Sequence, residues 1–217
     1  MQIIVKNMIE QGLRDKTVSE SQLARLVGGE PGRRYGLVNR ALKAQDLIRI
    51  RRGLYVLPPK YRTEPPDPFA VAQALEPGSY VSFESALGVH GWIPERVRVV
   101  ASVVPGRKSS TLDHPVLGSF TFHPLALHRE HFLELIERRQ VGTQTAWVAK
   151  PLRALMDLVT LRKANWQGFT WLTEGLRIDE HMLHKITRAQ IQTLLKVYKQ
   201  KRPKAFLANL AEELGLD

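Results

Sequence analysis

Residues 58–68 of this 217-residue chain contain five prolines, and this segment restricts the fold more than any other feature of the sequence. Proline fixes φ, lacks a backbone N–H donor and biases the residue before it towards extended backbone. A stretch with so many prolines predicts a stiff linker. We therefore expect two domains, an N-terminal one at residues 1–57 and a C-terminal one at residues 69–217.

Before the prolines, the apolar spacing predicts three helices followed by a β-hairpin. The first helix is expected at residues 5–13, and the pair Ser19 and Gln22 is a capping-box pattern that opens a second helix. A Gly-Gly pair ends the second helix, and a third runs from about Arg33 to Gln45. Residues 47–57 then alternate as two strands around an Arg-Arg-Gly turn. This order of elements is typical of a winged helix-turn-helix.

The excess positive charge of the chain is concentrated in one part of this region. The formal net charge is +11, and residues 33–62 hold nine basic side chains against Asp46 alone. Residues 1–32 carry four basic and four acidic side chains, so the first two helices form a neutral scaffold. A basic stretch of this kind favours a polyanionic partner such as nucleic acid.

Helical geometry divides the third helix into an apolar face and a basic face. Val38 and Ala41 fall on one side, while Asn39, Arg40 and Lys43 fall on the other. Arginine can form a bidentate pair with guanine and asparagine with adenine, and lysine suits phosphate groups. The hairpin adds arginines at its tip, where a wing meets DNA. The side chains that we expect to contact DNA are Ser19, Ser21, Arg33, Arg34, Tyr35, Asn39, Arg40, Lys43, Arg49, Arg51 and Arg52.

An alternative explanation of this basic region is a solvated face on a small domain. An isolated basic helix would favour that explanation. Here the helix, the hairpin and the segregation of charge agree with one another, which favours DNA binding.

The C-terminal half mixes helical and strand patterns, so the whole chain is expected to be α+β. Runs of β-branched and aromatic residues predict strands at residues 97–104 and 119–123. Helices are expected at residues 68–75, 82–90 and 147–161, and in a helical tail at 187–199 and 205–214. Residues 185–204 hold seven basic and no acidic side chains, which predicts a solvated helix face. A second nucleic-acid contact or an acidic partner surface is the alternative for this tail.

Catalytic and metal-binding patterns are weak throughout the sequence. The chain has no cysteine, which excludes disulfides, thiolate zinc sites and a cysteine nucleophile. No carboxylate completes a recognisable metal set with the histidines, although His181 and His184 have helical spacing. Residues 105–108, Pro-Gly-Arg-Lys, lack the glycine spacing of a phosphate loop, and no nucleophile motif surrounds Ser82 or Ser85. We expect no enzymatic activity, no cofactor and no bound metal.

The sequence favours neither a secretory signal peptide nor a membrane span. The N-terminus lacks a small-residue cleavage site, and no apolar run is long enough to span a bilayer. We therefore expect a cytoplasmic protein that does not contact a membrane.

Four stretches of the sequence resemble the AbiEi family, the antitoxins of abortive-infection type IV toxin–antitoxin systems. They are RRGLYVLP (51–58), DPFAVA (67–72), SYVSFESALGVHGWIPE (79–95) and AKPLRALMDL (149–158). The stretch at 79–95 is the most specific of them. Leu152 stands where the family has an acidic residue, so no role of that carboxylate transfers to this chain.

This resemblance implies an N-terminal domain that binds inverted repeats of double-stranded operator DNA and represses its own operon. It also implies a C-terminal domain needed for antitoxicity and a neighbouring nucleotidyltransferase-type toxin, counteracted without a stable complex. Two alternatives stay open. One is a nuclease or nucleotide-modifying enzyme delivered to DNA by the winged helix, with Glu84 or Asp157 in catalysis. The other is a C-terminal domain that binds the toxin directly.

Overall fold

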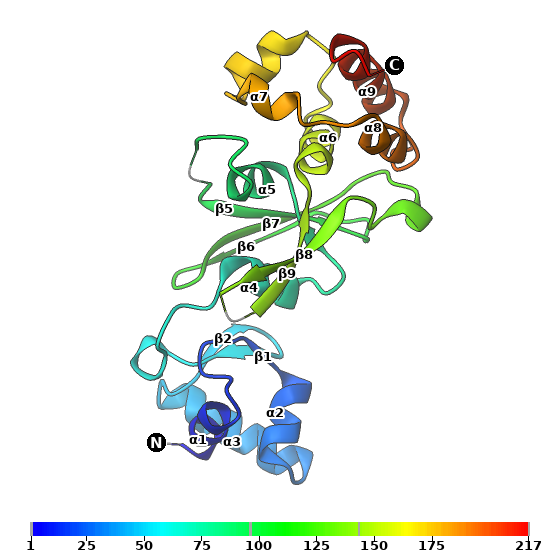
Figure 1. The fold of residues 1–217 in the computed structure, drawn as a ribbon. Coiled ribbons are helices and arrows are strands. Elements are labelled where there is room, and N and C mark those ends of the chain that lie inside the picture. Colours follow the sequence, from blue (N-terminus) through cyan, green and yellow to red (C-terminus); the bar gives the residue numbers. More distant parts are fainter. Residues whose placement is uncertain (1, 96, 143, 217) are drawn as a thin grey trace. The chain divides into compact units, whose positions relative to one another are not determined.

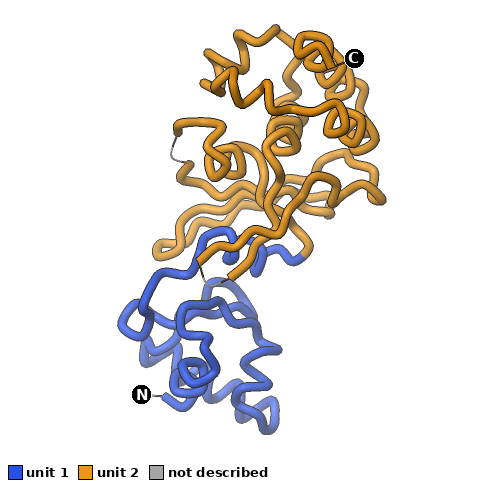
Figure 2. Tube along the Cα trace, viewed as in Figure 1, with its two compact units in different colours: residues 1–77 blue, residues 78–217 orange. Residues whose placement is uncertain are grey.

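The computed structural model describes residues 2–95, 97–142 and 144–216, and its architecture is mixed α+β, as expected. The chain divides into two compact units, Met1–Pro77 (unit 1) and Gly78–Asp217 (unit 2), which Figure 2 distinguishes by colour. Each unit has its own sheet. In the described part of the chain, no helix is long and apolar enough to cross a membrane.

Unit 1 begins with three helices and a small antiparallel sheet (Figure 1). The helices are α1 (Ile3–Glu10), α2 (Glu20–Val27) and α3 (Pro31–Lys43). The strands are β1 (Val18–Ser19), β2 (Ile48–Arg51) and β3 (Leu54–Val56), in the order β1-β3-β2. The expected helices and hairpin are present, and β1 is an additional strand that is too short to leave a pattern in the sequence.

Local sequence signals set the ends of these helices. The Ser19 Oγ accepts a hydrogen bond from the backbone N–H of Gln22, and Gln22 Oε1 accepts one from the Ser19 N–H at 2.8 Å. The expected capping box is therefore confirmed. Gly28 ends α2 with a φ of 65°, a conformation that glycine adopts without steric cost. Pro31 opens α3 slightly earlier than expected, because its fixed φ suits the first helical position.

The apolar faces of the three helices meet the sheet in the core of unit 1. Burial of each large apolar side chain contributes about 1.5–3 kcal/mol. The core consists of Ile4, Val5, Met8, Val18, Leu23, Val38, Ala41, Leu47, Tyr55 and Leu57. The apolar face expected for the third helix is thus the one that is buried.

The proline-rich segment is fastened to unit 1 and does not run free as a linker. The Asp15 carboxylate accepts a hydrogen bond from the backbone N–H of Thr63 at 2.7 Å. The Asp46 carboxylate accepts hydrogen bonds from Lys60 Nζ and the Tyr61 hydroxyl, both at 2.7 Å. The bond from Lys60, followed by that from Tyr61, lowers the pKa of Asp46.

The boundary between the two units differs accordingly from the expected one. The segment contains a short 3-10 helix, η1 (Pro59–Tyr61), and is followed by α4 (Pro68–Leu75), which also belongs to unit 1. The division lies after Pro77 and not at residues 58–68. Proline content indicated a stiff segment, but side-chain acceptors far away in the sequence determine where such a segment packs.

Unit 2 is built on a six-stranded mixed sheet with the order β6-β7-β5-β4-β9-β8. Its strands are β4 (Tyr80–Val81), β5 (Val99–Val104), β6 (Ser110–His114), β7 (Gly118–Pro124), β8 (Ile136–Val141) and β9 (Gln144–Ala149). Strand β5 runs parallel to β7 and β4 runs parallel to β9, while the other neighbours are antiparallel. The two expected strands correspond to β5 and β7, and the remaining four are additional.

Helices complete unit 2. Figure 1 shows α5 (Phe83–Val89) and α6 (Pro151–Arg162) on one face of the sheet, with α7 (Glu180–Leu183), α8 (Arg188–Leu195) and α9 (Lys201–Glu213) beyond α6. Two shorter segments are η2 (Arg129–His131), a 3-10 helix, and η3 (Trp171–Gly175), a π-helix.

The expected helix at residues 147–161 is wrong at its start. Trp147–Ala149 pair with β8 as the end of β9, and α6 begins at Pro151. A short apolar run can be strand or helix, and periodicity alone does not separate the two. The proline at the first helical position marks the boundary.

Candidate nucleic-acid interface

The side of α3 that faces away from the core of unit 1 is polar and exposed. Arg33, Arg40 and Lys43 are exposed, and Asn39 is half-buried. Tyr35 retains 70% of its accessible surface, an unusual fraction for a large aromatic side chain. The helix therefore presents cations, an amide and an aromatic ring to solvent.

These cations are not neutralised by the protein itself. Among the described residues, no carboxylate oxygen lies within ion-pair distance of Arg33, Arg40, Lys43, Arg49 or Arg52. Surface cations that no carboxylate neutralises can bind phosphate or base edges, and of these five Arg49 also interacts with the Tyr55 hydroxyl.

A glycine lies within this basic face of α3. A Cβ added at Gly36 would meet no atom of the protein within 4 Å, so the packing of unit 1 does not require a glycine there. Glycine in mid-helix costs about 0.5–1 kcal/mol relative to alanine. The missing side chain leaves the α3 backbone open to close approach by a partner.

Five of the expected contact residues have partners within unit 1, namely Ser19, Ser21, Arg34, Arg49 and Arg51. The Arg34 guanidinium donates a hydrogen bond to the carbonyl oxygen of Gly29 and so closes the turn between α2 and α3. The Ser19 hydroxyl caps α2. Arg51 forms an ion pair with Glu76 at 3.4 Å. Arg34 pairs with a backbone carbonyl, and Arg51 pairs with a carboxylate distant in sequence. The local sequence pattern does not predict either partner.

The tip of the β2–β3 hairpin lies next to the start of α2. The carbonyl oxygen of Gly53, at the turn, accepts a hydrogen bond from the Glu20 N–H at 2.8 Å, and Gly53 has a φ of 78°. The Tyr55 hydroxyl donates to the Glu20 carboxylate at 3.1 Å, and burial raises the pKa of that hydroxyl. Arg52 is exposed at the tip, and Ser21 is exposed on the first turn of α2. The hairpin is thus held rigidly while its arginine projects into solvent.

Unit 2 contains a second concentration of polar side chains, which is buried. Arg153 and Asp157 form an ion pair on α6 at 3.0 Å, with both side chains fully buried. The two Asp157 carboxylate oxygens also accept hydrogen bonds from Tyr198 at 2.8 Å, Ser82 at 2.7 Å and Tyr80 at 3.0 Å. We call these five residues the buried polar cluster.

The buried polar cluster is saturated with hydrogen bonds. The Arg153 guanidinium donates further to the Tyr80 hydroxyl at 2.6 Å and to the carbonyl oxygen of Glu134 at 2.8 Å. Burial raises the pKa of Tyr80 and of Tyr198 well above the usual tyrosine range. Burial alone would lower the pKa of Arg153. The neighbouring Asp157 carboxylate raises that pKa, and the net shift is upwards. The hydrogen bonds of this cluster link β4, α6 and the chain before α9.

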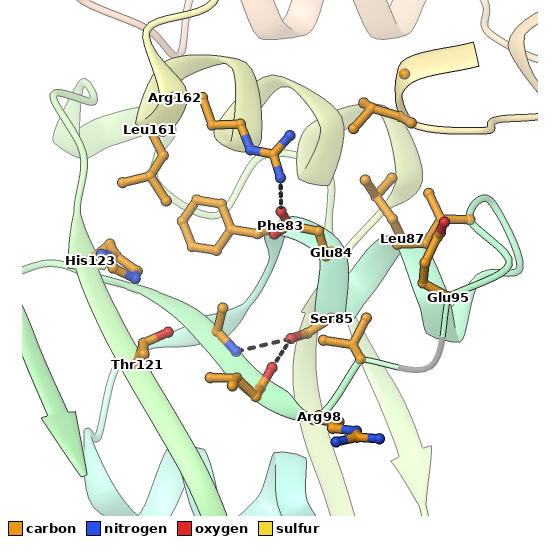
Figure 3. A pocket seen from close by; sticks show the side chains of 16 residues that line it. Phe83, Glu84, Ser85, Leu87, Glu95, Arg98, Thr121, His123, Leu161 and Arg162 are labelled. Atoms are coloured by element: carbon orange, nitrogen blue, oxygen red, sulfur yellow. Dashed lines mark hydrogen bonds and ion pairs between the residues drawn. The ribbon is translucent and has the colours of Figure 1, made fainter. Parts of the chain in front are cut away.

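A cavity of about 500 Å³ opens beside α5 in the same unit (Figure 3). Glu84 and Arg162 form an ion pair at 2.5 Å on its wall. The Ser85 hydroxyl donates to the carbonyl oxygen of Val99 and accepts from the N–H of Ala101, both at 2.9 Å, as the dashed lines in Figure 3 show. The serine therefore joins α5 to β5 and is not free to act as a nucleophile.

The backbone at the base of this cavity is strained. Phe83, at the junction of β4 and α5, has a φ of 56°, which is rare for a bulky residue. Its ring is fully buried and meets the His123 ring edge-to-face at 5.6 Å between centroids. Burial lowers the pKa of His123, which favours its neutral form.

The described residues offer little support for a metal site or for catalysis by Asp157 or Glu84. Within residues 2–95, 97–142 and 144–216, no group of three or more metal-ligating side chains is placed to hold a metal ion. Asp157 is enclosed by its partners, and Glu84 is paired with Arg162. No protein-family model matches the chain, and a search of curated proteins finds no significant match.

Proposed function

We propose that this chain is a sequence-specific DNA-binding protein in which residues 3–56 form a winged helix-turn-helix. In this proposal, α3 is the recognition helix and the β2–β3 hairpin is the wing. The observation that carries it is the row of exposed cations on α3 and at the hairpin tip, without carboxylate partners among the described residues. A solvated surface without a partner would more commonly interleave charges of both signs.

The side chains of α3 and of the hairpin take different roles in this proposal. Arg40 and Asn39 suit base edges in the major groove, which is wide enough for an α-helix. Arg33, Lys43 and Arg52 suit the phosphates on either side. The local bonds of Arg34, Arg51 and Ser19 favour a supporting role for these three residues, in which they fix the helix and hairpin for binding.

We further propose that the protein represses its own operon from the cytoplasm and serves as the antitoxin of a type IV toxin–antitoxin system. The proposal rests on the resemblance to the AbiEi family. Two of the stretches that carry the resemblance, 79–95 and 149–158, contribute Tyr80, Ser82, Arg153 and Asp157 to the buried polar cluster. These stretches therefore meet in one structural feature of unit 2.

The experiment is a gel-shift titration of the full chain with the DNA upstream of its own gene. We expect tight binding to inverted repeats, with two protomers on one duplex and half-sites spaced by whole helical turns. Scrambled DNA of the same length is the control, and binding should fall steeply with salt because phosphate contacts release counterions. Equal affinity for the scrambled duplex, or no binding at low salt, would contradict the proposal.

The enzymatic alternative needs a carboxylate that can reach a substrate. Asp157 is fully buried and accepts hydrogen bonds on both oxygens, and Glu84 is engaged by Arg162. We therefore prefer the proposal without catalysis. Copurification of the tagged chain with the neighbouring gene product separates direct toxin binding from the type IV scheme, in which no stable complex forms.

A further inference from the structure

A second cavity of unit 2, of about 640 Å³, is lined by cations, and none of the described residues on its wall is acidic. The exposed carboxylate of Glu130 lies outside this lining, although a backbone hydrogen bond, and with it the charge of Lys199, lowers its pKa. Three cations line it: Arg107, from the turn after β5; Arg129, from η2; and Lys199, from the segment between α8 and α9. Its other lining residues are Val104, Pro105, Leu125, Ala126, Leu127 and Phe132. The cavity thus combines a cationic side with apolar and aromatic walls.

The backbone around this cavity is fixed by hydrogen bonds. The N–H of Lys199 donates to the carbonyl oxygen of Ala126 at 3.0 Å, and the N–H of His128 donates to that of Val197 at 2.8 Å. Leu127 and Tyr198 form an antiparallel bridge between the same two segments. This pairing places Lys199 and Arg129 on the wall of the same cavity, although the two are distant in sequence. The segments that carry Arg129 and Lys199 are therefore joined by backbone hydrogen bonds, which fix their positions on the cavity wall.

The position of the cavity in the sheet also favours ligand binding. Strands β5 and β7 are parallel neighbours, and the cavity lies where they end, at Val104 and just after Pro124. Ligands of open α/β sheets bind in the crevice outside the carboxyl ends of parallel strands. The volume lies within the range of about 300–1,000 Å³ that is usual for small-molecule sites.

We propose that this cavity binds a phosphorylated small molecule of the nucleotide class. The phosphates face Arg107, Arg129 and Lys199, and the base lies against the apolar wall that includes Phe132. A free nucleotide is favoured over a nucleic-acid strand because the site is a concave cavity with an apolar wall, whereas a strand follows an extended basic groove. The inference concerns unit 2 and does not depend on the DNA-binding proposal for unit 1.

Isothermal titration calorimetry of the full chain with ATP, GTP, CTP and UTP tests this proposal. We expect at least one nucleotide to bind, and both adenosine and tripolyphosphate to bind more weakly than that nucleotide. Adenosine lacks the phosphates, and tripolyphosphate lacks the base. Failure of all four nucleotides at millimolar concentration would overturn the proposal. So would tripolyphosphate binding as tightly as the best nucleotide, or a single-stranded RNA binding more tightly than every mononucleotide and losing that affinity in the cavity variants.

Matched charge reversals separate the cavity from the general basicity of the chain. Arg129→Glu and Lys199→Glu should each weaken nucleotide binding by about tenfold or more, because each removes a charge-assisted hydrogen bond. Arg188→Glu and Lys196→Glu change the net charge equally at exposed positions that line neither cavity, and should leave affinity within about twofold. Two pairs keep the test valid if one variant fails to fold. Equal losses in the cavity variants and the controls would overturn the proposal.

Discussion

At the scale of single residues, Arg153 and Asp157 show what a buried charge requires. Removing both from water carries a desolvation cost of several kcal/mol per ion, which their attraction offsets only with good geometry and further hydrogen bonds. Tyr80, Ser82, Tyr198 and a backbone carbonyl supply those bonds. The partners come from segments on both sides of α6 in the sequence, so the pair depends on the complete fold of unit 2.

Removal of one member of this pair should be costly. Asp157→Ala leaves Arg153 buried and uncompensated, and we expect a loss of about 3–5 kcal/mol in the free energy of unfolding. Urea titrations followed by tryptophan fluorescence report on unit 2 alone, because all four tryptophans lie there. The control is Glu84→Gln, which breaks a partly exposed ion pair and should cost less than about 1 kcal/mol. Similar losses in the two variants would contradict this account of the cluster.

At the scale of elements, α3 and the β2–β3 hairpin differ in what their arginines can recognise. A helix in the major groove meets base edges, whereas a hairpin tip with a single exposed arginine meets backbone or a neighbouring groove. Arg40 is exposed on α3 and Arg52 at the hairpin tip, and neither has an ion-pair partner among the described residues. Substitution of Arg40 therefore tests the sequence specificity of binding, and substitution of Arg52 tests the affinity for DNA of any sequence.

Arg40→Ala should relax sequence preference, with a loss of about 1–3 kcal/mol on the operator and less on scrambled DNA. Arg52→Ala should weaken binding to both duplexes similarly and reduce the salt slope by about one unit. Gel-shift titrations of both duplexes at several salt concentrations measure these effects. If both variants bind like the parent, the assignment of recognition helix and wing fails.

The elements also show how far the sequence predicts the fold. The capping box, the glycine that ends α2 and the hairpin turn depend on neighbours a few residues away, and they are confirmed. Strands β1 and β4 are only two residues long, and their partners are distant in sequence. Strands β6, β8 and β9 belong to hairpins with short turns, but their apolar patterns are too short or ambiguous to predict them.

The same distinction applies to the candidate site. The exposed face of α3 follows from helical periodicity alone. The engagement of Arg34 by Gly29 and of Arg51 by Glu76 depends on tertiary contacts. The cavities and the buried polar cluster of unit 2 arise from segments far apart in sequence, so residue spacing could not indicate them.

At the scale of the whole molecule, the positive charge is shared between the units. Unit 1 carries 13 basic and 8 acidic residues, and unit 2 carries 19 and 13. Unit 2 also holds half-buried histidines that favour the neutral form. Burial lowers the pKa of His90, whose Nε2 lies 2.9 Å from the carbonyl oxygen of Ala149 and whose Nδ1 faces Arg139. The hydrogen bond with Ala149 and the carboxylate of Glu137, 3.9 Å away, raise this pKa but only partly oppose the effect of burial.

The stability of unit 2 should therefore depend on pH. Between the lowered pKa of folded His90 and His123 and the unfolded value of about 6.5, the unfolded chain binds more protons. The stability that His90 and His123 contribute is fully present above that unfolded pKa, and it decreases as the pH falls below it. We expect a lower urea midpoint by tryptophan fluorescence at pH 5.5 than at pH 7.5. The difference should shrink in His90→Asn, and a midpoint that rises on acidification would contradict the prediction.

The attachment of the proline-rich segment to unit 1 has a consequence for gene fusion and recombination. A crossover at residues 58–68 would separate Asp15 and Asp46 from the groups that donate to them, and would remove α4 from its unit. A crossover after Pro77 would transfer the first unit with all of these bonds intact. Exchange of the N-terminal part between related genes should therefore succeed at the later position, although the prolines suggest the earlier one.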